Sequence, residues 1–252
     1  MKFIVKLLLI VAAILAYIGV SLAFCIFLRS DKRLKACTNI TSFFCGIGLR
    51  ILNIRPSLIN KETLLPEKNV MIVANHLSYI DVLIVSSYIP TLFITSVEVK
   101  LSGFLGLISS LGGSLFVERR NRADLKNEIQ SVADKLSRGF NICLFPEATS
   151  SDGSGVLPFK SSMVDAAIIA GKQLAPLCIK YTSINGAPAD RSNLDAACYY
   201  DDMFFFPHLI NLLKQKSFKA EVTVLQPIDT AHRERKEVCS VAFEVIRKQY
   251  LA

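Results

Sequence analysis

The sequence predicts an α/β fold: a mixed, mostly parallel sheet flanked by helices, preceded by an N-terminal membrane-anchoring helical segment. Two patterns lead to this prediction. From residue 70 onward, short runs of β-branched and apolar residues alternate with stretches of helical periodicity. Ahead of them, residues 7–28 carry no charged side chain, a length that crosses the roughly 30 Å hydrocarbon core of a bilayer as a helix. We therefore expect an anchor over residues 1–66 and a globular domain over residues 67–252.

The N-terminal apolar run is bounded by basic residues: Lys2 and Lys6 before it, and Arg29, Lys32, Arg33 and Lys35 after it. A signal peptide would have an apolar core of about 7–15 residues, so the longer run favours a retained transmembrane helix, although Ser21-Leu22-Ala23 resembles a cleavage site. A helix lying in the membrane interface needs a polar face, which this run lacks. The excess of basic residues after the run favours the inner membrane, with the following domain in the cytoplasm.

A second apolar segment, residues 34–54, is interrupted by polar side chains such as Thr38, Asn39 and Arg50. This pattern favours an amphipathic helix lying on the membrane, or a hairpin partner of the first helix, over a second membrane span. Pro56 and Pro66 then bracket a polar connector. The predicted globular domain begins just after this connector.

Within the domain, strands are expected at residues 70–74, 92–97, 115–117, 142–145, 174–181 and 220–224, and helices at 123–138, 160–172 and 230–250. The first of these helices places Leu125, Ile129, Val132 and Leu136 on one face. Residues 101–111 are apolar almost all round, which fits two alternatives: a buried helix, or a surface element that touches acyl chains or the bilayer.

The chain has a formal net charge of +8, and basic surfaces serve nucleic acids, anionic lipid headgroups or anionic substrates. Zinc-finger spacing, an RNP-like aromatic motif and basic repeats are all missing from the sequence, which argues against a nucleic-acid partner and leaves membrane lipids and anionic substrates. Seven cysteines form no Cys-x-x-Cys pair and lie mostly in apolar stretches, as buried thiols in a reducing compartment do. No cluster has metal-ligand spacing, so we expect neither a metal nor a bound cofactor.

The stretch Val73-Ala-Asn-His-Leu-Ser-Tyr-Ile-Asp81 joins the end of a buried strand to the start of a helix. Ser78 occupies the place of an N-cap and Asp81 that of the acidic partner in a capping box. Such a carboxylate folds back toward the residues before the cap, and His76 is one of them. A carboxylate bonded to His76 would fix its tautomer and stabilise its imidazolium form. We therefore predict a catalytic base that deprotonates a hydroxyl brought by the substrate.

Asn75-His76-x4-Asp81 also resembles the first motif of the glycerolipid acyltransferase family, which includes 1-acylglycerol-3-phosphate acyltransferases. Three further blocks follow in that family's order and approximate spacing. Gly113-Ser-Leu-Phe116-Val-Glu118-Arg119 resembles G-x-x-F-[IV]-[DE]-R. Phe145-Pro-Glu147-Ala-Thr149-Ser150 with Leu157-Pro-Phe-Lys160 resembles F-P-E-G-T-R-S and its trailing P-F-K, and Leu174-Ala-Pro176-Leu-Cys-Ile179 resembles the family's apolar-Pro-apolar strand.

The resemblance implies catalytic roles for His76 and Asp81. It implies substrate-binding roles for Gly113, Phe116, Glu118, Arg119, Glu147, Thr149, Lys160 and Pro176. The guanidinium of Arg119 would hold a phosphate in a bidentate fork. Glu147 would contact polar groups of the acceptor or position the basic residues, and Lys160 would add positive charge. For Pro176 we expect a packing role.

The function implied by the resemblance is transfer of an acyl group from acyl-CoA or acyl carrier protein to the free hydroxyl of a lysophospholipid. The expected acceptor is 1-acyl-sn-glycerol-3-phosphate, giving phosphatidic acid; CoA is then a co-substrate. Two positions depart from the family pattern: Ala148 replaces the usual Gly, and Ser150 replaces the common Arg. Because Ser150 removes a phosphate-binding cation, a second lysolipid such as lyso-ornithine lipid is an alternative acceptor. A catalytically silent, lipid-binding scaffold is the alternative of a different class.

Overall fold

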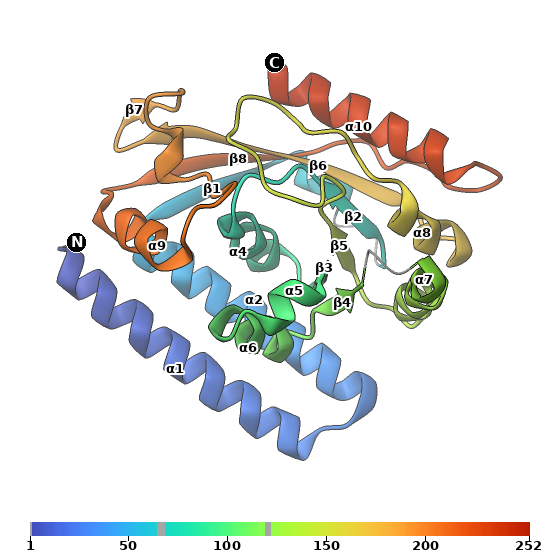
Figure 1. The fold of residues 1–252 in the computed structure, drawn as a ribbon, viewed down its shortest axis with the longest axis horizontal. Helices are drawn as coiled ribbons and strands as arrows, with labels where there is room; N and C mark the ends of the chain where they lie inside the picture. Colours follow the sequence, from blue (N-terminus) through green and yellow to red (C-terminus); the bar gives the residue numbers. More distant parts are fainter. Residues whose placement is uncertain (1, 65–68, 119–121) are drawn as a thin grey trace.

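The computed structural model describes residues 2–64, 69–118 and 122–252 (Figure 1). The helices are α1 (Phe3–Phe27), α2 (Ser30–Leu52), α3 (Lys61–Leu64), α4 (Tyr79–Tyr88), α5 (Val97–Leu101), α6 (Phe104–Leu111), α7 (Arg122–Ser137), α8 (Asp165–Ile169), α9 (Phe205–Lys214) and α10 (Arg235–Leu251). The strands are β1 (Ile54–Ile59), β2 (Met71–Ala74), β3 (Leu92–Ser96), β4 (Leu115–Val117), β5 (Ile142–Leu144), β6 (Leu174–Ile184), β7 (Ala187–Pro188) and β8 (Phe218–Val224). All six predicted strands are present; β4 has the predicted bounds, and the other five have shifted ends.

Eight strands of the described residues form one sheet in the order β1-β8-β6-β2-β5-β3-β4, with β7 paired to β6. The pairs β6–β8 and β6–β7 are antiparallel, and the other neighbours are parallel. The predicted mixed, mostly parallel sheet is therefore confirmed. Every residue of β2 is buried, as expected of a parallel strand that is covered on both faces.

Helices cover both faces of this sheet (Figure 1). On one face, α4 lies next to the sheet, α2 packs on α4, and α1 forms the outermost layer. On the other face, α10 packs against β6. Val238, Ala242 and Ile246 of α10 are buried at spacings of one helical turn, which explains why the helix lies flat on the sheet.

The N-terminal helices form an antiparallel hairpin (Figure 1). By length and composition, α1 is the one helix in the described part of the chain that is able to cross a membrane. Its polar side chains bond to the rest of the protein: Lys6 Nζ donates to the carbonyls of Gln215 (2.6 Å) and Leu52 (3.3 Å), and the Tyr17 hydroxyl donates to the carbonyl of Ile108 (3.1 Å). Large apolar side chains are exposed along the rest of α1.

The elements missed by the sequence prediction include β1, α3, β7 and α9. β1 lies where we expected the end of the amphipathic segment and a polar connector that begins at Pro56. β1 is an edge strand, where the missing N–H of a proline is tolerated. The division of the chain at residue 66 stays a prediction; β1 precedes it and is nonetheless part of the sheet. Another missed element, α9, carries Pro207 in its first turn, the one helical position that accepts proline.

The apolar stretch at residues 101–111 combines features of both alternatives. It contains the end of α5 and the whole of α6. Leu111 is buried, whereas Leu101 and Leu107 are exposed. The segment is thus a partly buried element that presents apolar side chains at the surface.

Candidate active site

The first and third predicted blocks meet at one edge of the sheet. β2 and β5 are neighbouring parallel strands, so the residues that follow them, His76 after β2 and Glu147 after β5, emerge at the same edge. Asn75 extends the strand pairing by one residue. Its Nδ2 donates to the carbonyl of Ile179 (2.9 Å), and its Oδ1 accepts from the N–H of Ile179 (2.8 Å). The chain therefore leaves the sheet at His76 from a fixed position.

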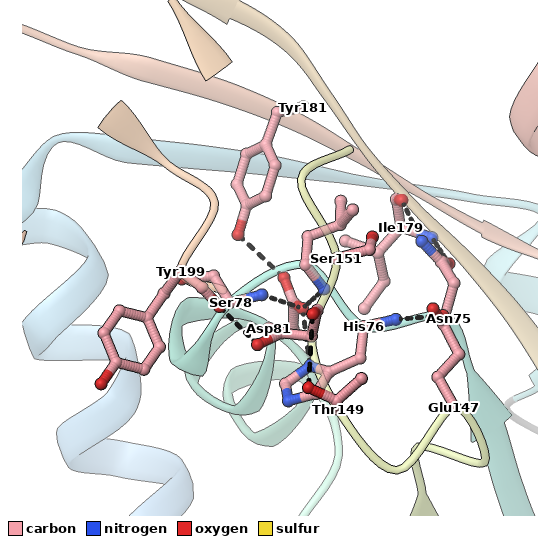
Figure 2. A network of polar contacts seen from close by, with 12 residues as sticks. Asn75, His76, Ser78, Asp81, Glu147, Thr149, Ser151, Ile179, Tyr181 and Tyr199 are labelled. Carbon is pink, nitrogen blue, oxygen red and sulfur yellow. Dashed lines mark hydrogen bonds and ion pairs between the residues drawn. The ribbon is translucent and has the colours of Figure 1, made fainter. Parts of the chain in front are cut away.

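His76 and Asp81 form the predicted pair (Figure 2). Nδ1 of His76 lies 3.0 Å from Oδ2 of Asp81; the Asp81 side chain is fully buried, and that of His76 is 20% exposed. Ser78 is the N-cap of α4 and Asp81 its third residue. The same Oδ2 accepts from the N–H of Leu77 (2.6 Å) and of Ser78 (2.8 Å). The cap and the His76–Asp81 pair are thus one arrangement, because the turn that caps α4 brings the carboxylate to the imidazole.

Further contacts hold the two side chains in place. The Tyr181 hydroxyl donates to Oδ1 of Asp81 at 2.8 Å, so the buried carboxylate has partners on both oxygens. The His76 ring stacks on Phe145, with the centroids 4.1 Å apart and an interplanar angle of 14°. Hydrogen bonds of this kind offset the cost of burying the Asp81 charge.

This geometry suits general base chemistry. With Nδ1–H of His76 donating to Asp81, the lone pair of Nε2 is the one left to accept a proton. The Asp81 carboxylate would then stabilise the imidazolium that forms. The partial exposure of His76 leaves its ring within reach of a substrate hydroxyl.

Glu147 ties the third block to the first. Its Oε1 accepts from the N–H of His76 (2.7 Å) and its Oε2 from the N–H of Leu157 (2.9 Å), while the residue is 4% exposed. Burial raises the pKa of Glu147 to about 7, although the two backbone hydrogen bonds act in the opposite direction. The N–H of Ser151 also donates to the carbonyl of His76 (2.9 Å). The backbone of His76 is therefore held by the loop after β5.

Comparison with known proteins agrees with this arrangement. The family model described as Acyltransferase matches residues 55–180, which is half of the 252-residue chain. The chain belongs to the Acyltransferase family. The predicted family membership is confirmed, and the match includes His76, Asp81 and Glu147.

Two of the relatives found for this Acyltransferase-family chain carry different names. The lyso-ornithine lipid O-acyltransferase of Rhizobium meliloti (strain 1021) is 33% identical over 183 residues, covering 69% of this chain and 63% of the relative. The 1-acyl-sn-glycerol-3-phosphate acyltransferase of Neisseria gonorrhoeae is 30% identical over 165 residues, covering 66% of this chain and 62% of the relative. Each match thus spans a little less than two thirds of the relative's length.

The fold itself matches a solved structure. The crystal structure of the 1-acyl-sn-glycerophosphate (LPA) acyltransferase PlsC from Thermotoga maritima superposes with a TM-score of 0.70 at 20% sequence identity. The match covers 100% of this chain and 97% of that one. It confirms the predicted fold class, including the N-terminal helices.

The second block lies on β4, at the edge of the sheet and three strands away from β2, the strand that leads to His76 and Asp81. Gly113 precedes the amino end of β4 with φ +80°, a conformation that favours glycine, and an added Cβ would crowd the side chains of Leu92 (3.1 Å) and Leu34 (3.3 Å). Lys100 Nζ lies 5.6 Å from the centroid of the Phe116 ring. The N–H of Glu118 donates to Oε1 of Glu128 (2.8 Å). Arg119 lies outside the described residues, and all four substrate-binding roles stay predictions.

The remaining predicted residues belong to the third and fourth blocks. Thr149 is exposed in the loop after β5, and Lys160 is exposed with its N–H donating to the carbonyl of Pro146 (2.8 Å). Pro176 is buried within β6 opposite Val73, a position suited to packing. Ala148 adopts φ +64°, a conformation that favours glycine, which explains why the family pattern has glycine at this position.

Three residues of the site were not assigned roles from the sequence: Asn75, Phe145 and Tyr181. Asn75 and Phe145 lie inside the recognised first and third blocks, so the sequence motifs already indicated that both residues belong to the site. Tyr181 lies two residues beyond the fourth block, and only the pairing of β6 with β2 brings it to Asp81. Sequence spacing alone does not indicate such a contact.

Proposed function

We propose that this protein transfers an acyl group from a thioester donor, acyl-CoA or acyl carrier protein, to the free hydroxyl of a lysophospholipid. The observation that carries the proposal is the 3.0 Å contact between Nδ1 of a partly exposed His76 and Oδ2 of a fully buried Asp81. Membership in the Acyltransferase family supports the same reaction.

In the proposed reaction, Nε2 of His76 accepts the hydroxyl proton while the hydroxyl oxygen attacks the thioester carbonyl. Asp81 stabilises the imidazolium, and the carbon–sulfur bond then breaks. The leaving thiolate takes the proton from His76, so the products are the acylated lipid and a free thiol. General base catalysis of this kind contributes about 10²–10⁴-fold to a rate.

The first acceptor we propose is 1-acyl-sn-glycerol-3-phosphate, which gives phosphatidic acid. The relative from Neisseria gonorrhoeae carries the name of this activity. The net charge of +8 suits an anionic headgroup, and Arg119 and Lys160 are the cations that we assign to it. Gly113, Phe116, Glu118 and Thr149 remain proposed acceptor contacts, whereas for Glu147 we propose that it positions His76.

Lyso-ornithine lipid is the second candidate acceptor, and Ser150 is the residue that favours it. This side chain stands where the family commonly has an arginine, and its hydroxyl donates to the carbonyl of Tyr199. A phosphate-binding cation is thereby lost from the loop beside His76. The Rhizobium meliloti relative is named for acylation of lyso-ornithine lipid.

We further propose that the protein acts at the cytoplasmic face of the inner membrane. The exposed apolar side chains of α1 support membrane association. Phe204, just before α9, and Phe206 in its first turn are also exposed, and the Phe206 ring packs against Phe104 of α6. These side chains extend the apolar surface from α1 toward the domain.

The test is an assay of the purified, full-length protein in phospholipid nanodiscs with both donors and a panel of acceptors. The panel contains 1-acylglycerol-3-phosphate, lyso-ornithine lipid and lysophosphatidylcholine, and each reaction is followed by thiol release and mass spectrometry of the lipid. We expect thiol release that depends on the acceptor and is fastest with the phosphate monoester. Preference for lyso-ornithine lipid would establish the second candidate, and no acyl transfer with any pair would contradict the enzymatic proposal in favour of a lipid-binding scaffold.

A further inference from the structure

The two oxygens of the Asp81 carboxylate have different partners (Figure 2). Oδ2 faces the turn before α4, where it contacts His76 and the backbone N–H groups of Leu77 and Ser78. Oδ1 accepts from the Tyr181 hydroxyl at 2.8 Å. Asp81 is 0% exposed and Tyr181 is 3% exposed, so water does not readily replace this donor.

Tyr181 reaches Asp81 from a strand whose position is fixed on both sides. β6 pairs with β2 through Leu177 opposite Ala74, and with β8 through Tyr181 opposite Ala220. Two residues before Tyr181, the backbone of Ile179 holds the Asn75 amide. β6 therefore contributes one contact to the residue preceding His76 and a second to the carboxylate that serves His76.

We propose that Tyr181 is a positioning residue of the acyl transfer: its hydroxyl fixes the orientation of the Asp81 carboxylate and stabilises the negative charge that supports His76. This inference rests on the proposed function. It also gives a chemical role to the strand of the fourth block, in which we expected a packing role for Pro176.

The hydroxyl is suited to act as a donor. Burial raises the pKa of Tyr181 well above its ordinary value of 10.0, and the nearby Asp81 carboxylate adds to this effect, so the phenol stays protonated. Without the hydroxyl, Oδ1 becomes a buried, undonated carboxylate oxygen, and the His76–Asp81 pair takes up a proton more readily. A protonated pair cannot act as a base. As the pH is lowered, activity would therefore begin to fall at a higher pH than in wild type.

Other titratable groups also lie around this carboxylate: Cys143 on β5, Glu147 in the loop after it, Cys198 before α9 and Tyr250 on α10. Tyr79 on α4 lies near the Tyr181 hydroxyl. Glu147 is the one that titrates near neutrality. A Tyr181→Phe variant keeps Glu147 and its two backbone contacts. A difference between the pH profiles of the variant and the wild type therefore reports the missing hydroxyl.

The experiment compares Tyr181→Phe with wild type and with Tyr88→Phe in the thiol-release assay across pH 5–9. Tyr88 is the matched control because it lies on α4 with Asp81 and donates its hydroxyl to the carbonyl of Pro56 (2.6 Å), away from the pair. A hydrogen bond to a charged group contributes about 1.5–3 kcal/mol, so we expect kcat to fall about 10- to 100-fold in Tyr181→Phe. We also expect the acid limb of the Tyr181→Phe profile, the range in which kcat falls as the pH is lowered, to move to higher pH by about one unit. Tyr88→Phe should retain the wild-type profile.

A second variant separates the hydroxyl from the packing of the ring. Tyr181→3-fluorotyrosine keeps both the ring and a more acidic, stronger donor, so we expect a rate within about threefold of wild type and an acid limb at or below the wild-type pH. This variant also tests the proposal if Tyr181→Phe does not fold.

Three results would overturn the positioning role: a wild-type rate in Tyr181→Phe, an acid limb that does not move, or a fluorotyrosine variant as slow as the phenylalanine one. Failure of the proposed function is a separate result, because it would be seen as absent transfer in the wild-type protein.

Discussion

Oε1 of Glu147 accepts a hydrogen bond from the backbone N–H of His76 at 2.7 Å. This contact joins residues that are 71 positions apart in the chain and come from different recognised blocks. Because Oε2 of the same carboxylate accepts from Leu157, a single side chain organises both the turn after β2 and the loop after β5. The position of the histidine backbone thus depends on the third block.

Glu147 should make the stability of the protein depend on pH. Its pKa is raised from 4.5 to about 7 on folding, so between these values the folded state binds a proton that the unfolded state has lost. The contribution of Glu147 to the free energy of unfolding therefore falls as the pH rises through this window. Glutamine does not titrate. As the pH rises from 5 to 8, we therefore expect the thermal midpoint of Glu147→Gln to rise relative to that of wild type.

The measurement for this prediction is the thermal midpoint of both proteins at each pH. Glu244→Gln, at an exposed position of α10, is the control. A constant difference between Glu147→Gln and wild type over the whole range would show that Glu147 does not titrate in this window.

Asp81→Asn should remove most of the activity. An amide cannot supply the negative charge that supports the imidazolium, and its single oxygen cannot accept at the positions of both Oδ1 and Oδ2. We expect kcat to fall about 10²–10⁴-fold. Asp134→Asn, at an exposed site on α7, should keep the wild-type rate. An Asp81→Asn variant within threefold of wild type would remove Asp81 from the mechanism.

Asn75→Ala should destabilise the fold. The substitution leaves the buried N–H and carbonyl of Ile179 without their partner, and each such group costs about 1–3 kcal/mol. We expect the free energy of unfolding in urea to fall by about 2–4 kcal/mol. Asn39→Ala, which removes one exposed bond to the carbonyl of Lys35, should change it by less than about 0.5 kcal/mol. Equal effects of the two substitutions would show that the two Asn75–Ile179 hydrogen bonds do not stabilise the junction of β2 and β6.

Ser150→Arg should change the acceptor preference. The new guanidinium restores a phosphate-binding cation to the loop beside His76, and a charge-assisted hydrogen bond contributes about 1.5–3 kcal/mol. We expect the rate ratio of 1-acylglycerol-3-phosphate to lyso-ornithine lipid to rise about tenfold or more. Ser150→Ala removes only the bond to the Tyr199 carbonyl and serves as the control. If the ratio stays constant in both variants, residue 150 does not select the headgroup.

The fold was largely predictable because hydrophobic periodicity is a local signal. The six strands found from apolar runs are all present, and the cap at Ser78 and Asp81 lies where the spacing placed it. The prediction failed at Pro56 and Pro207, whose local preference is overridden by an edge position and by the first turn of a helix.

The chemistry of the site was predictable only in part. His76 and Asp81 are five residues apart, and a helix cap brings such neighbours together. Two other contacts depend on the order of the strands in the sheet instead: Glu147 accepts from the N–H of His76, and the Tyr181 hydroxyl donates to Asp81. Sequence spacing carries no information about which strands become neighbours, so both contacts required the structure.

The most direct test of the proposed mechanism is the rate of acyl transfer by His76→Ala in nanodiscs. The variant keeps the backbone N–H that Glu147 accepts and the carbonyl that Ser151 bonds, so we expect folding and membrane binding to be retained. His232→Ala, at an exposed loop position, is the matched control. We predict that His76→Ala loses at least about 10²-fold in kcat while His232→Ala does not. Transfer by a folded His76→Ala near the wild-type rate would contradict the assignment of His76 as the base.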